Sequence, residues 1–252
     1  MIRPGCTLGI LGRMIAMAAA QLGLKTHVYA PDENSPAFEV ATDYTIAPYE
    51  DEANLVRFAK AVEVVTYEFE NVPSETAATL SAHALLAPNA QALAVSQDRF
   101  LEKSFIAGLG IAVAPFAPVS GEAELLEAVE RIGRPAVLKT RRFGYDGKGQ
   151  VKIAPGSDPV AAWEEIGRAA SILEGFVPFE REVSVVAART AAGAFAAYDL
   201  CANEHRNHIL DTTRIPAGVS SATEEQAFRI ARAIADSLDY VGVLAVELFL
   251  VT

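Results

Sequence analysis

The sequence predicts an α/β protein of two domains, a doubly wound parallel domain over residues 1–96 and an α+β domain over residues 97–252. Three observations lead to this prediction. Short apolar strands alternate with helices in the first half, which is the pattern of a parallel sheet covered by helices. Pairs of strands predominate in the second half. The length of 252 residues exceeds the ~100 to 200 residues of a usual single domain.

The first half reads as the opening of a doubly wound unit. Its predicted strands are residues 8–11, 25–30 and 64–70, and its predicted helices are residues 13–23, 55–62 and a segment that starts at Pro73. The next helix has Asp98 and Arg99 near its start and Gly108 and Gly110 as its stops. We therefore place the domain boundary near residue 96.

The second half combines helices with strand pairs. The predicted elements are an amphipathic helix at 121–133, partner strands at 134–140 and 151–154, a helix around 161–170, and strands at 182–189 and 194–200. Thr223 and Gln226 form a T-x-x-Q capping box that predicts the start of a long helix. The last segment, 243–251, is so continuously apolar that we expect a strand covered on both faces.

Composition limits the possible functions. Apolar residues make up 51% of the sequence, which predicts a globular chain with a packed core. The formal net charge of -11 argues against nucleic-acid binding, which needs a broad basic surface. The longest apolar runs fall short of the ~20 residues of a membrane span. Cys6 and Cys201 are far apart, which favours a reducing, cytoplasmic location. We therefore expect small-molecule partners.

The segment KTRRFGYDGKGQ, residues 139–150, gathers positive charge in an acidic chain. Its glycines allow close backbone approach to a ligand, and they are Gly144, Gly147 and Gly149. Its cations suit a polyphosphate, and they are Lys139, Arg141, Arg142 and Lys148. The segment lies between two predicted strands and contains no G-x-x-x-x-G-K-[ST] string, so it is not a P-loop. The alternative is a solvated hairpin with ordinary surface charge.

The GILG string near the N-terminus is a weaker signal. Asp32 has the spacing expected of a ribose-binding acid in a dinucleotide fingerprint. Gly9 and Gly12 alone do not complete the glycine pattern of that fingerprint. Packing of a strand against a helix is the simpler interpretation.

TYEFEN carries two carboxylates at the end of a predicted parallel strand. Because side chains alternate along a strand, Thr66, Glu68 and Glu70 point to one face. Open α/β sheets bind ligands at the carboxyl ends of their strands, so the two glutamates are candidate substrate ligands. An edge strand with a solvated acidic face is the alternative.

Glu247 stands alone among apolar residues in VLAVELFLV. Burial of an unpaired carboxylate costs several kcal/mol, so we expect a cation beside it. A magnesium ion with nucleotide phosphates would supply one, and a buried arginine is the structural alternative.

Several glutamates, including Glu174 and Glu182, surround an apolar connector in the segment ILEGFVPFEREVS. Backbone groups of such a connector can form hydrogen bonds with a nucleotide base, and a carboxylate can bind the ribose of that nucleotide. Surface charge is the alternative. His205 and His208 lie in a polar stretch, where histidines are more often surface residues than ligands.

Six segments in this order resemble one family closely: VVTYEFENVP, QDRFLEK, PAVLKTRRFGYDGKGQ, ILEGFVPFEREVSV, NEHRNHILDTT and GVLAVELF. The family is 5-(carboxyamino)imidazole ribonucleotide synthase, an ATP-grasp enzyme of purine biosynthesis. The likeness covers nearly the whole chain. It implies a Rossmann-like pre-ATP-grasp domain followed by an ATP-grasp domain, with ATP and Mg²⁺ as cofactors and a homodimer as the assembly.

The resemblance also implies roles for individual residues. Arg99 and Lys139 would contact the ATP phosphates, under a loop made of Gly144, Tyr145, Asp146, Gly147, Lys148, Gly149 and Gln150. The nucleotide would be held by Glu174, Gly175, Phe176 and Val177 at adenine, by Glu182 at ribose, and by His205. Glu247 would ligate magnesium. The aminoimidazole ribonucleotide and bicarbonate would face Tyr145, Asp146 and Lys148 together with Glu68 and Glu70.

The implied reaction activates bicarbonate. Attack on the γ-phosphate of ATP gives carboxyphosphate, and the cations stabilise the charge on the transferring group. The exocyclic amine of the ribonucleotide then captures the carboxyl carbon, or carbon dioxide released from it. Asp146 is the candidate for accepting the amine proton, with Lys148 as its catalytic neighbour.

Two departures from the family pattern affect the expected site. The family reads GILGGGQLGRM where this chain reads GILGRM. A deletion would remove a turn near the ribonucleotide phosphate. Because a strand-to-helix turn without loop residues is hard to close, we expect further residues between Gly12 and Arg13. The chain also stops at VELFLVT, before the family's N-E-I-A-P-R segment, so we expect the C-terminal part of the ATP-grasp domain, with its second magnesium ligand, to be missing.

Other functions remain open from the sequence. The nearest alternative is another ATP-grasp ligase, such as formate-dependent glycinamide ribonucleotide transformylase or biotin carboxylase. A catalytically silent nucleotide-binding protein is an alternative of a different class. A dinucleotide oxidoreductase is more distant, because the glycine fingerprint is incomplete.

Overall fold

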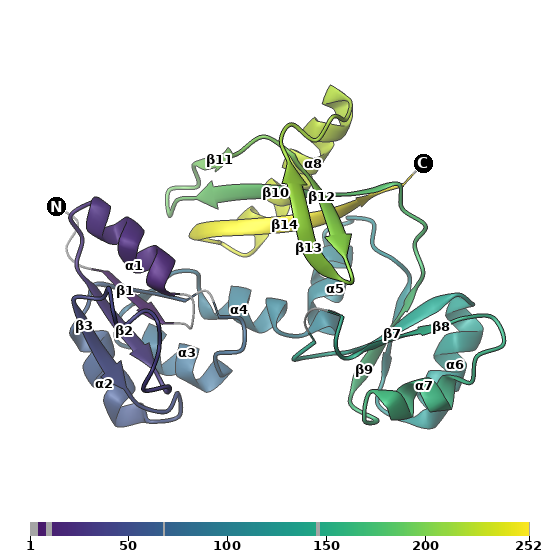
Figure 1. Ribbon diagram of the computed structural model, residues 1–252, viewed down its shortest axis with the longest axis horizontal. Coiled ribbons are helices and arrows are strands. Elements are labelled where there is room, and N and C mark those ends of the chain that lie inside the picture. The colour runs from purple at the N-terminus through teal and green to yellow at the C-terminus, as the bar shows by residue number, and fades with distance from the viewer. Residues whose placement is uncertain (1–4, 9–11, 68, 145–146, 252) are drawn as a thin grey trace. The chain divides into compact units, whose positions relative to one another are not determined.

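The computed structural model describes residues 5–8, 12–67, 69–144 and 147–251 (Figure 1). The chain divides into two units. The first comprises Met1–Ala94 with Asp239–Gly242, and the second comprises Val95–Leu238 with Val243–Thr252. The boundary expected near residue 96 lies close to this division. Each unit has its own sheets and core, and the two are described separately below.

A parallel five-stranded sheet forms the centre of the first unit. Its order is β3-β2-β1-β4-β5, with bounds β1 Gly5–Leu8, β2 Thr26–Ala30, β3 Asp43–Ile46, β4 Val64–Tyr67 and β5 Leu85–Leu86. Its helices are α1 Gly12–Gln21, α2 Glu52–Lys60, α3 Ser74–Ser81 and α4 Ala90–Ser96. The strand order reverses at β1, so the predicted doubly wound arrangement is confirmed. Tyr29, Leu55, Phe58 and Leu80 lie in its core with at most 2% exposure.

Two predictions for the first unit are wrong in detail. The first strand was predicted over 8–11 and is observed at Gly5–Leu8, and residues 9–11 of the GILGRM turn lie outside the described part of the chain. Helix α1 begins at Gly12, and the expectation of further residues between Gly12 and Arg13 stays a prediction. The strand predicted over 64–70 ends at Tyr67, so Glu70 lies in the following turn and not on a shared strand face. Glu68 lies outside the described residues. The shared carboxylate face predicted for TYEFEN is therefore not formed by the described strand.

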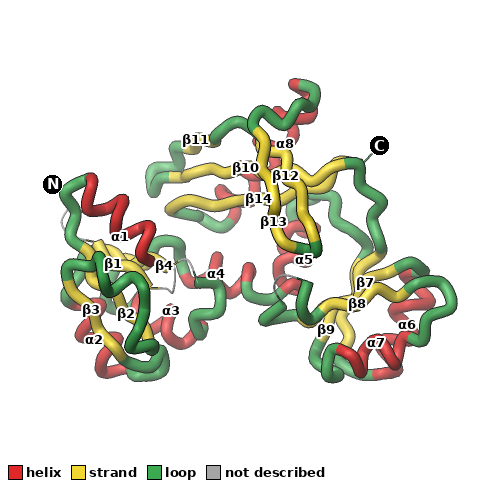
Figure 2. The backbone as a smooth tube through the Cα atoms, viewed as in Figure 1, coloured by secondary structure: helices red, strands yellow, loops and turns green. Residues whose placement is uncertain are grey.

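The second unit contains two sheets, whose strands are drawn in yellow in Figure 2. The first is antiparallel in the order β6-β9-β7-β8, with bounds β6 Phe116–Val119, β7 Ala136–Thr140, β8 Gln150–Ile153 and β9 Ser171–Gly175. Helices α6 Glu122–Ile132 and α7 Pro159–Glu165 contribute to its core. Helix α5, Arg99–Gly108, precedes this sheet in the chain.

The second sheet of this unit follows the order β11-β10-β12-β13, with β14 also paired to β10. Its bounds are β10 Arg181–Arg189, β11 Phe195–Ala197, β12 Cys201–Arg206, β13 Ile209–Arg214 and β14 Gly242–Leu250. Helix α8, Ser221–Ser237, shares a core with these strands. The predicted capping box is wrong, because Ser220 caps the helix by accepting a hydrogen bond from the Thr223 amide. The helix therefore starts one turn before the predicted cap.

Strand β14 is covered on one face only, which corrects the prediction of a strand covered on both. Leu244, Val246, Leu248 and Leu250 pack against the core that includes α8. The alternate residues are exposed, and they include Val243 at 67% and Phe249 at 54%. Apolar residues on both faces of a strand gave the sequence the appearance of a fully buried one.

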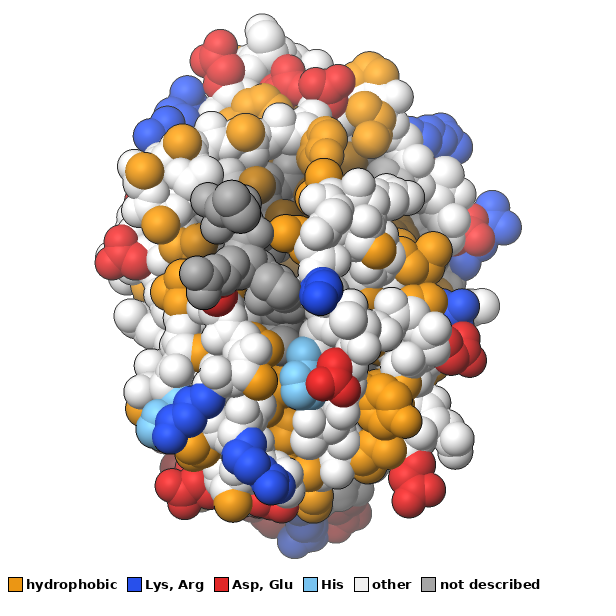
Figure 3. Space-filling model, turned by 90° about the vertical axis from the view of Figure 1, so that its left-hand side faces the viewer, with side chains coloured by type: hydrophobic (Ala, Val, Ile, Leu, Met, Phe, Trp, Pro, Cys, Tyr) orange, Lys and Arg blue, Asp and Glu red, His pale blue; other side chains and the backbone are white. Residues whose placement is uncertain are grey.

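Charge and membrane character are consistent with the composition. On the face drawn in Figure 3, acidic and basic side chains are interspersed among apolar and uncharged ones. None of the helices in the described part of the chain has the length and apolar character that crossing a bilayer requires.

Candidate nucleotide site

The glycine loop connects two paired strands, as predicted. Lys139 on β7 pairs with Gln150 on β8, and the Thr140 amide donates to the Gly149 carbonyl at 2.8 Å. Gly147 and Gly149 have φ angles of +77° and +69°, which side chains rarely tolerate. A methyl group at Gly149 would also lie 2.6 Å from Thr140 Oγ1. The described part of the loop thus places its backbone close to its neighbours, and Tyr145 and Asp146 lie outside the described residues.

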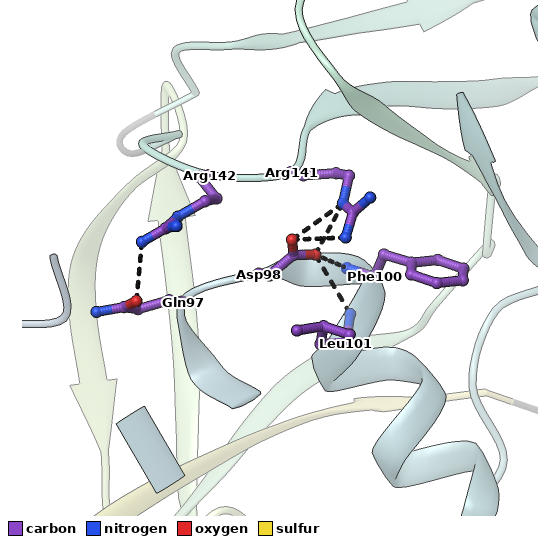
Figure 4. A network of polar contacts seen from close by, with 6 residues as sticks. All are labelled: Gln97, Asp98, Phe100, Leu101, Arg141 and Arg142. Atoms are coloured by element: carbon purple, nitrogen blue, oxygen red, sulfur yellow. Dashed lines mark hydrogen bonds and ion pairs between the residues drawn. The ribbon is translucent and has the colours of Figure 1, made fainter. Parts of the chain in front are cut away.

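The base of the loop is tied to the start of α5 (Figure 4). The Arg141 guanidinium forms an ion pair with Asp98 at 2.7 Å, and Arg142 donates to Gln97 Oε1 at 2.8 Å. Arg99 donates from Nη2 to the Gly144 carbonyl at 3.2 Å. Arg141 thus forms an ion pair within the protein, so part of the positive charge counted in the segment is balanced by Asp98.

Asp98 holds this junction in two ways. It is the N-cap of α5, accepting hydrogen bonds from the amides of Phe100 and Leu101, and it accepts from Arg141 Nε at 3.0 Å. Burial alone would raise the pKa of the Asp98 carboxyl, but the hydrogen bonds from Arg141 and the two amides outweigh burial and lower it. A hollow of about 630 Å³ borders this junction and reaches Gly149 and Ala170.

Lys139 points to a buried carboxylate on the neighbouring strand. Its Nζ lies 2.9 Å from Glu174 Oε2, and Lys103 Nζ lies 3.5 Å from the same oxygen. The Glu174 side chain is 8% exposed, and its Oε1 has no hydrogen-bond partner among the described residues. A buried acceptor of this kind costs free energy unless a donor reaches it, so Oε1 suits an amino group of a ligand.

Lys103 is a further candidate residue of the site, and the sequence interpretation missed it. It lies four residues after Arg99 on α5, and residues with this spacing share one helix face. That spacing was the available signal. The side chains of Arg99 and Lys103 thus extend the cationic region from the loop to Glu174.

The segment after Glu174 is held by its backbone. The Gly175 amide donates to the Pro115 carbonyl at 2.8 Å, and the Phe176 amide donates to the Pro135 carbonyl at 3.1 Å. Phe176 is 42% exposed. Val177 is partly buried. These bonds fix the course of the predicted adenine-binding segment.

Glu182 and His205 come together on neighbouring strands. Glu182 on β10 pairs in register with Asn203 on β12, and an irregularity in the β12–β13 ladder lies between Glu204 and His205. Such irregularities re-aim side chains. The Glu182 carboxylate contacts His205 Nδ1. Both side chains are about one quarter exposed, so both can be reached by a ligand.

Glu247 is exposed on β14, which corrects the expectation of a buried carboxylate. It does not require a cation to offset burial. Among the described residues, no group of three or more histidine, cysteine, aspartate or glutamate side chains could hold a metal ion. A lone exposed carboxylate still fits magnesium, which is usually held by one or two carboxylates together with substrate phosphates.

Comparison with known proteins agrees with this arrangement. Residues 104–252 match the ATP-grasp domain family, and residues 6–97 match the ribonucleotide synthetase preATP-grasp domain. The N5-carboxyaminoimidazole ribonucleotide synthase of Brucella melitensis is 46% identical over 98% of this chain and 70% of its own length. That of Pseudomonas aeruginosa is 42% identical over 96% of this chain and 66% of its own length.

Solved structures give the same result. The N5-carboxyaminoimidazole ribonucleotide synthetase of Thermus thermophilus has a TM-score of 0.90 at 43% identity, covering 100% of this chain and 68% of that one. An ADP complex of such a synthetase has a TM-score of 0.93 at 38% identity, covering 99% and 67%. This chain therefore belongs to the N5-carboxyaminoimidazole ribonucleotide synthase family, which combines a preATP-grasp domain with an ATP-grasp domain.

Proposed function

We propose that the second unit binds Mg·ATP and that the chain uses it to carboxylate the exocyclic amine of 5-aminoimidazole ribonucleotide with bicarbonate. Membership of the family supports this reaction. The observation that carries the nucleotide site is the buried Glu174 carboxylate, which pairs with Lys103 and Lys139 beside the glycine loop and whose buried Oε1 has no hydrogen-bond partner among the described residues. This arrangement suits an adenine amine at one end and phosphates at the other.

The phosphates would lie at Arg99, Lys139 and the loop from Gly144 to Gln150, and the ribose would lie at Glu182 and His205. Arg99 is already fixed on Gly144, so its guanidinium needs little rearrangement to act there. The adenine would lie along Glu174, Gly175, Phe176 and Val177, a segment that two backbone hydrogen bonds keep in place. Preorganised contacts of this kind lose little conformational freedom when a ligand binds.

The reaction would proceed in two steps. A bicarbonate oxygen attacks the γ-phosphorus, ADP leaves, and carboxyphosphate forms. The exocyclic amine nitrogen then bonds to the carboxyl carbon, inorganic phosphate leaves, and the amine loses a proton. Asp146 would accept that proton, and Lys148 would stabilise the anionic carboxyl group; Tyr145, Glu68 and Glu70 would contact the ribonucleotide.

Magnesium would be held by Glu247 together with the ATP phosphates, and it would supply electrostatic stabilisation to the transferring phosphoryl group. The exposure of Glu247 permits this role. A homodimer and a cytoplasmic location complete the proposal. Light scattering during gel filtration tests the assembly state.

Substrate-dependent ADP release tests the function. ADP release that requires 5-aminoimidazole ribonucleotide and bicarbonate is the expected result. A requirement for glycinamide ribonucleotide or biotin would indicate another ATP-grasp ligase. Thermal stabilisation by Mg·ATP without ADP release for any of the three would indicate a nucleotide-binding protein without catalytic activity.

A further inference from the structure

The β12–β13 hairpin ends in a turn of unusual composition. Arg206 pairs with Ile209, so Asn207 and His208 are the two turn residues. Their φ angles are +52° and +64°. Two-residue turns with both central residues left-handed favour Asn-Gly, because the second position places most side chains under strain. Histidine occupies this position despite that strain, and a strained residue can mark a functional contact.

His208 lies directly against the glycine loop. A methyl group built on Gly147 would lie 2.8 Å from His208 Cδ2 and 2.9 Å from its Cβ. Such distances are too short for any side chain at residue 147, so glycine is required there by the neighbour as well as by its own φ of +77°. Two residues further on, a methyl group built on Gly149 would lie 2.6 Å from Thr140 Oγ1. Residues 147–149 are thus bracketed by Thr140 on β7 and His208 on the hairpin.

We propose that His208 is a positioning residue for residues 147–149, which it holds in place before ATP binds. The inference rests on the proposed function, in which this segment contacts the phosphates. A glycine-rich segment that is already held loses less conformational freedom on binding than a free one. The same hairpin carries His205, which contacts Glu182, so it fixes the segment relative to the proposed ribose ligands.

His208→Gly tests the role. We expect the KM for ATP to rise about fivefold with kcat within about twofold of wild type, because His208 contacts the segment and not the reacting atoms. The melting temperature should stay constant or rise, since glycine is the preferred residue at this turn position. A lower melting temperature with an unchanged KM for ATP would mean that His208 serves only the hairpin, and would overturn the inference.

The contact itself is tested by a double-mutant cycle in the full chain. Gly147→Ala should raise the KM for ATP, and adding His208→Gly should recover part of this loss, because the clash with the imidazole is removed. Gly156→Ala is the matched control: its φ is +85° with no atom within 4 Å, so it carries the backbone strain alone and should leave the KM unchanged. If the two substitutions change the KM for ATP by factors that simply multiply in the double variant, the contact between His208 and residue 147 is contradicted.

Trypsin cleavage after Lys148 separates this inference from the proposed function. Without nucleotide, His208→Gly should be cleaved several-fold faster than wild type, and equal rates would overturn the positioning role. Protection of the wild type by Mg·ATP reports only on phosphate binding by the segment. Faster cleavage of the variant without any protection by Mg·ATP would preserve the positioning role and refute the proposed nucleotide contact.

Discussion

Lys139 on β7 and Glu174 on β9 are diagonal neighbours across the strand pair, with 2.9 Å between Nζ and Oε2. Lys103 approaches the same oxygen, at 3.5 Å. The carboxylate is the buried member, at 8% exposure against 21% and 23% for the lysines. One buried anion therefore organises two partly exposed cations at the position proposed for the nucleotide.

Lys139→Met should weaken ATP binding by roughly tenfold, which corresponds to ~1.4 kcal/mol. The substitution keeps the aliphatic stem and removes only the charge. Stability should change little, because Lys103 still neutralises Glu174. Isothermal titration calorimetry with a non-hydrolysable ATP analogue measures the affinity.

Lys139→Arg should restore part of this affinity, because it returns the positive charge. Lys60→Met, an exposed position on α2, is the control for a general loss of positive charge. Equal affinities for wild type and Lys139→Met would remove Lys139 from the phosphate site.

Asp98 combines a helix cap with an ion pair, and two substitutions separate these contributions. Asp98→Asn should keep the cap, since asparagine caps helices as well as aspartate, and should lose ~0.5 to 1 kcal/mol from the Arg141 pair. Asp98→Ala should lose about 1 kcal/mol more, because the cap is lost as well. Urea unfolding at pH 7 measures both free energies.

The ion-pair contribution should depend on pH. The pKa of Asp98 is lowered in the folded protein, so its ionisation stabilises the fold above the unfolded value of ~3.9. This stabilisation is lost as the pH falls through the lower folded value. The difference between wild type and Asp98→Asn should therefore shrink below about pH 4. A difference that stays constant from neutral to acid pH would show that the charge of Asp98 does not contribute.

The sequence predicts elements best where one strong pattern decides them. The alternating first half predicts the doubly wound sheet, but β3 and β5 have only 4 and 2 residues and show no periodicity. Hairpin β12–β13 was not predicted from the sequence. Its residues are mostly polar and exposed, so its strands show no alternation of apolar and polar residues. Strand β14 was predicted with the wrong burial because apolar residues also occupy its exposed face.

The site shows a similar division. Residue types drew attention to the glycine loop, whereas only the resemblance to the family singled out Glu174, Glu182 and His205 as nucleotide ligands. A count of the charged residues in the loop segment could not show that Arg141 pairs with Asp98, which lies 43 residues earlier in the sequence. Pairs of this separation form only when the fold brings strands and helix ends together, so no local pattern reports them.

Glu182→Gln should reduce discrimination between ATP and 2′-deoxy-ATP. The Glu182 carboxylate, held by His205, is proposed to accept a hydrogen bond from a ribose hydroxyl. A site that binds this hydroxyl rejects an analogue that lacks it, because a charged acceptor is then left without its donor. For a partly exposed carboxylate, we expect wild type to bind ATP about fivefold to tenfold more tightly than 2′-deoxy-ATP. Competition binding with both nucleotides measures the ratio. A ratio that is the same in wild type and variant would place the ribose elsewhere.

Glu247→Gln distinguishes a metal ligand from a structural carboxylate. Because Glu247 is exposed, its replacement should change the free energy of unfolding by less than ~0.5 kcal/mol. The magnesium concentration that gives half-maximal ADP release should rise about tenfold, since a neutral amide binds a hard divalent cation less tightly than a carboxylate. Glu130→Gln, exposed on α6, should change neither quantity. An altered stability with an unchanged magnesium requirement would mean that Glu247 supports strand β14 and not the metal.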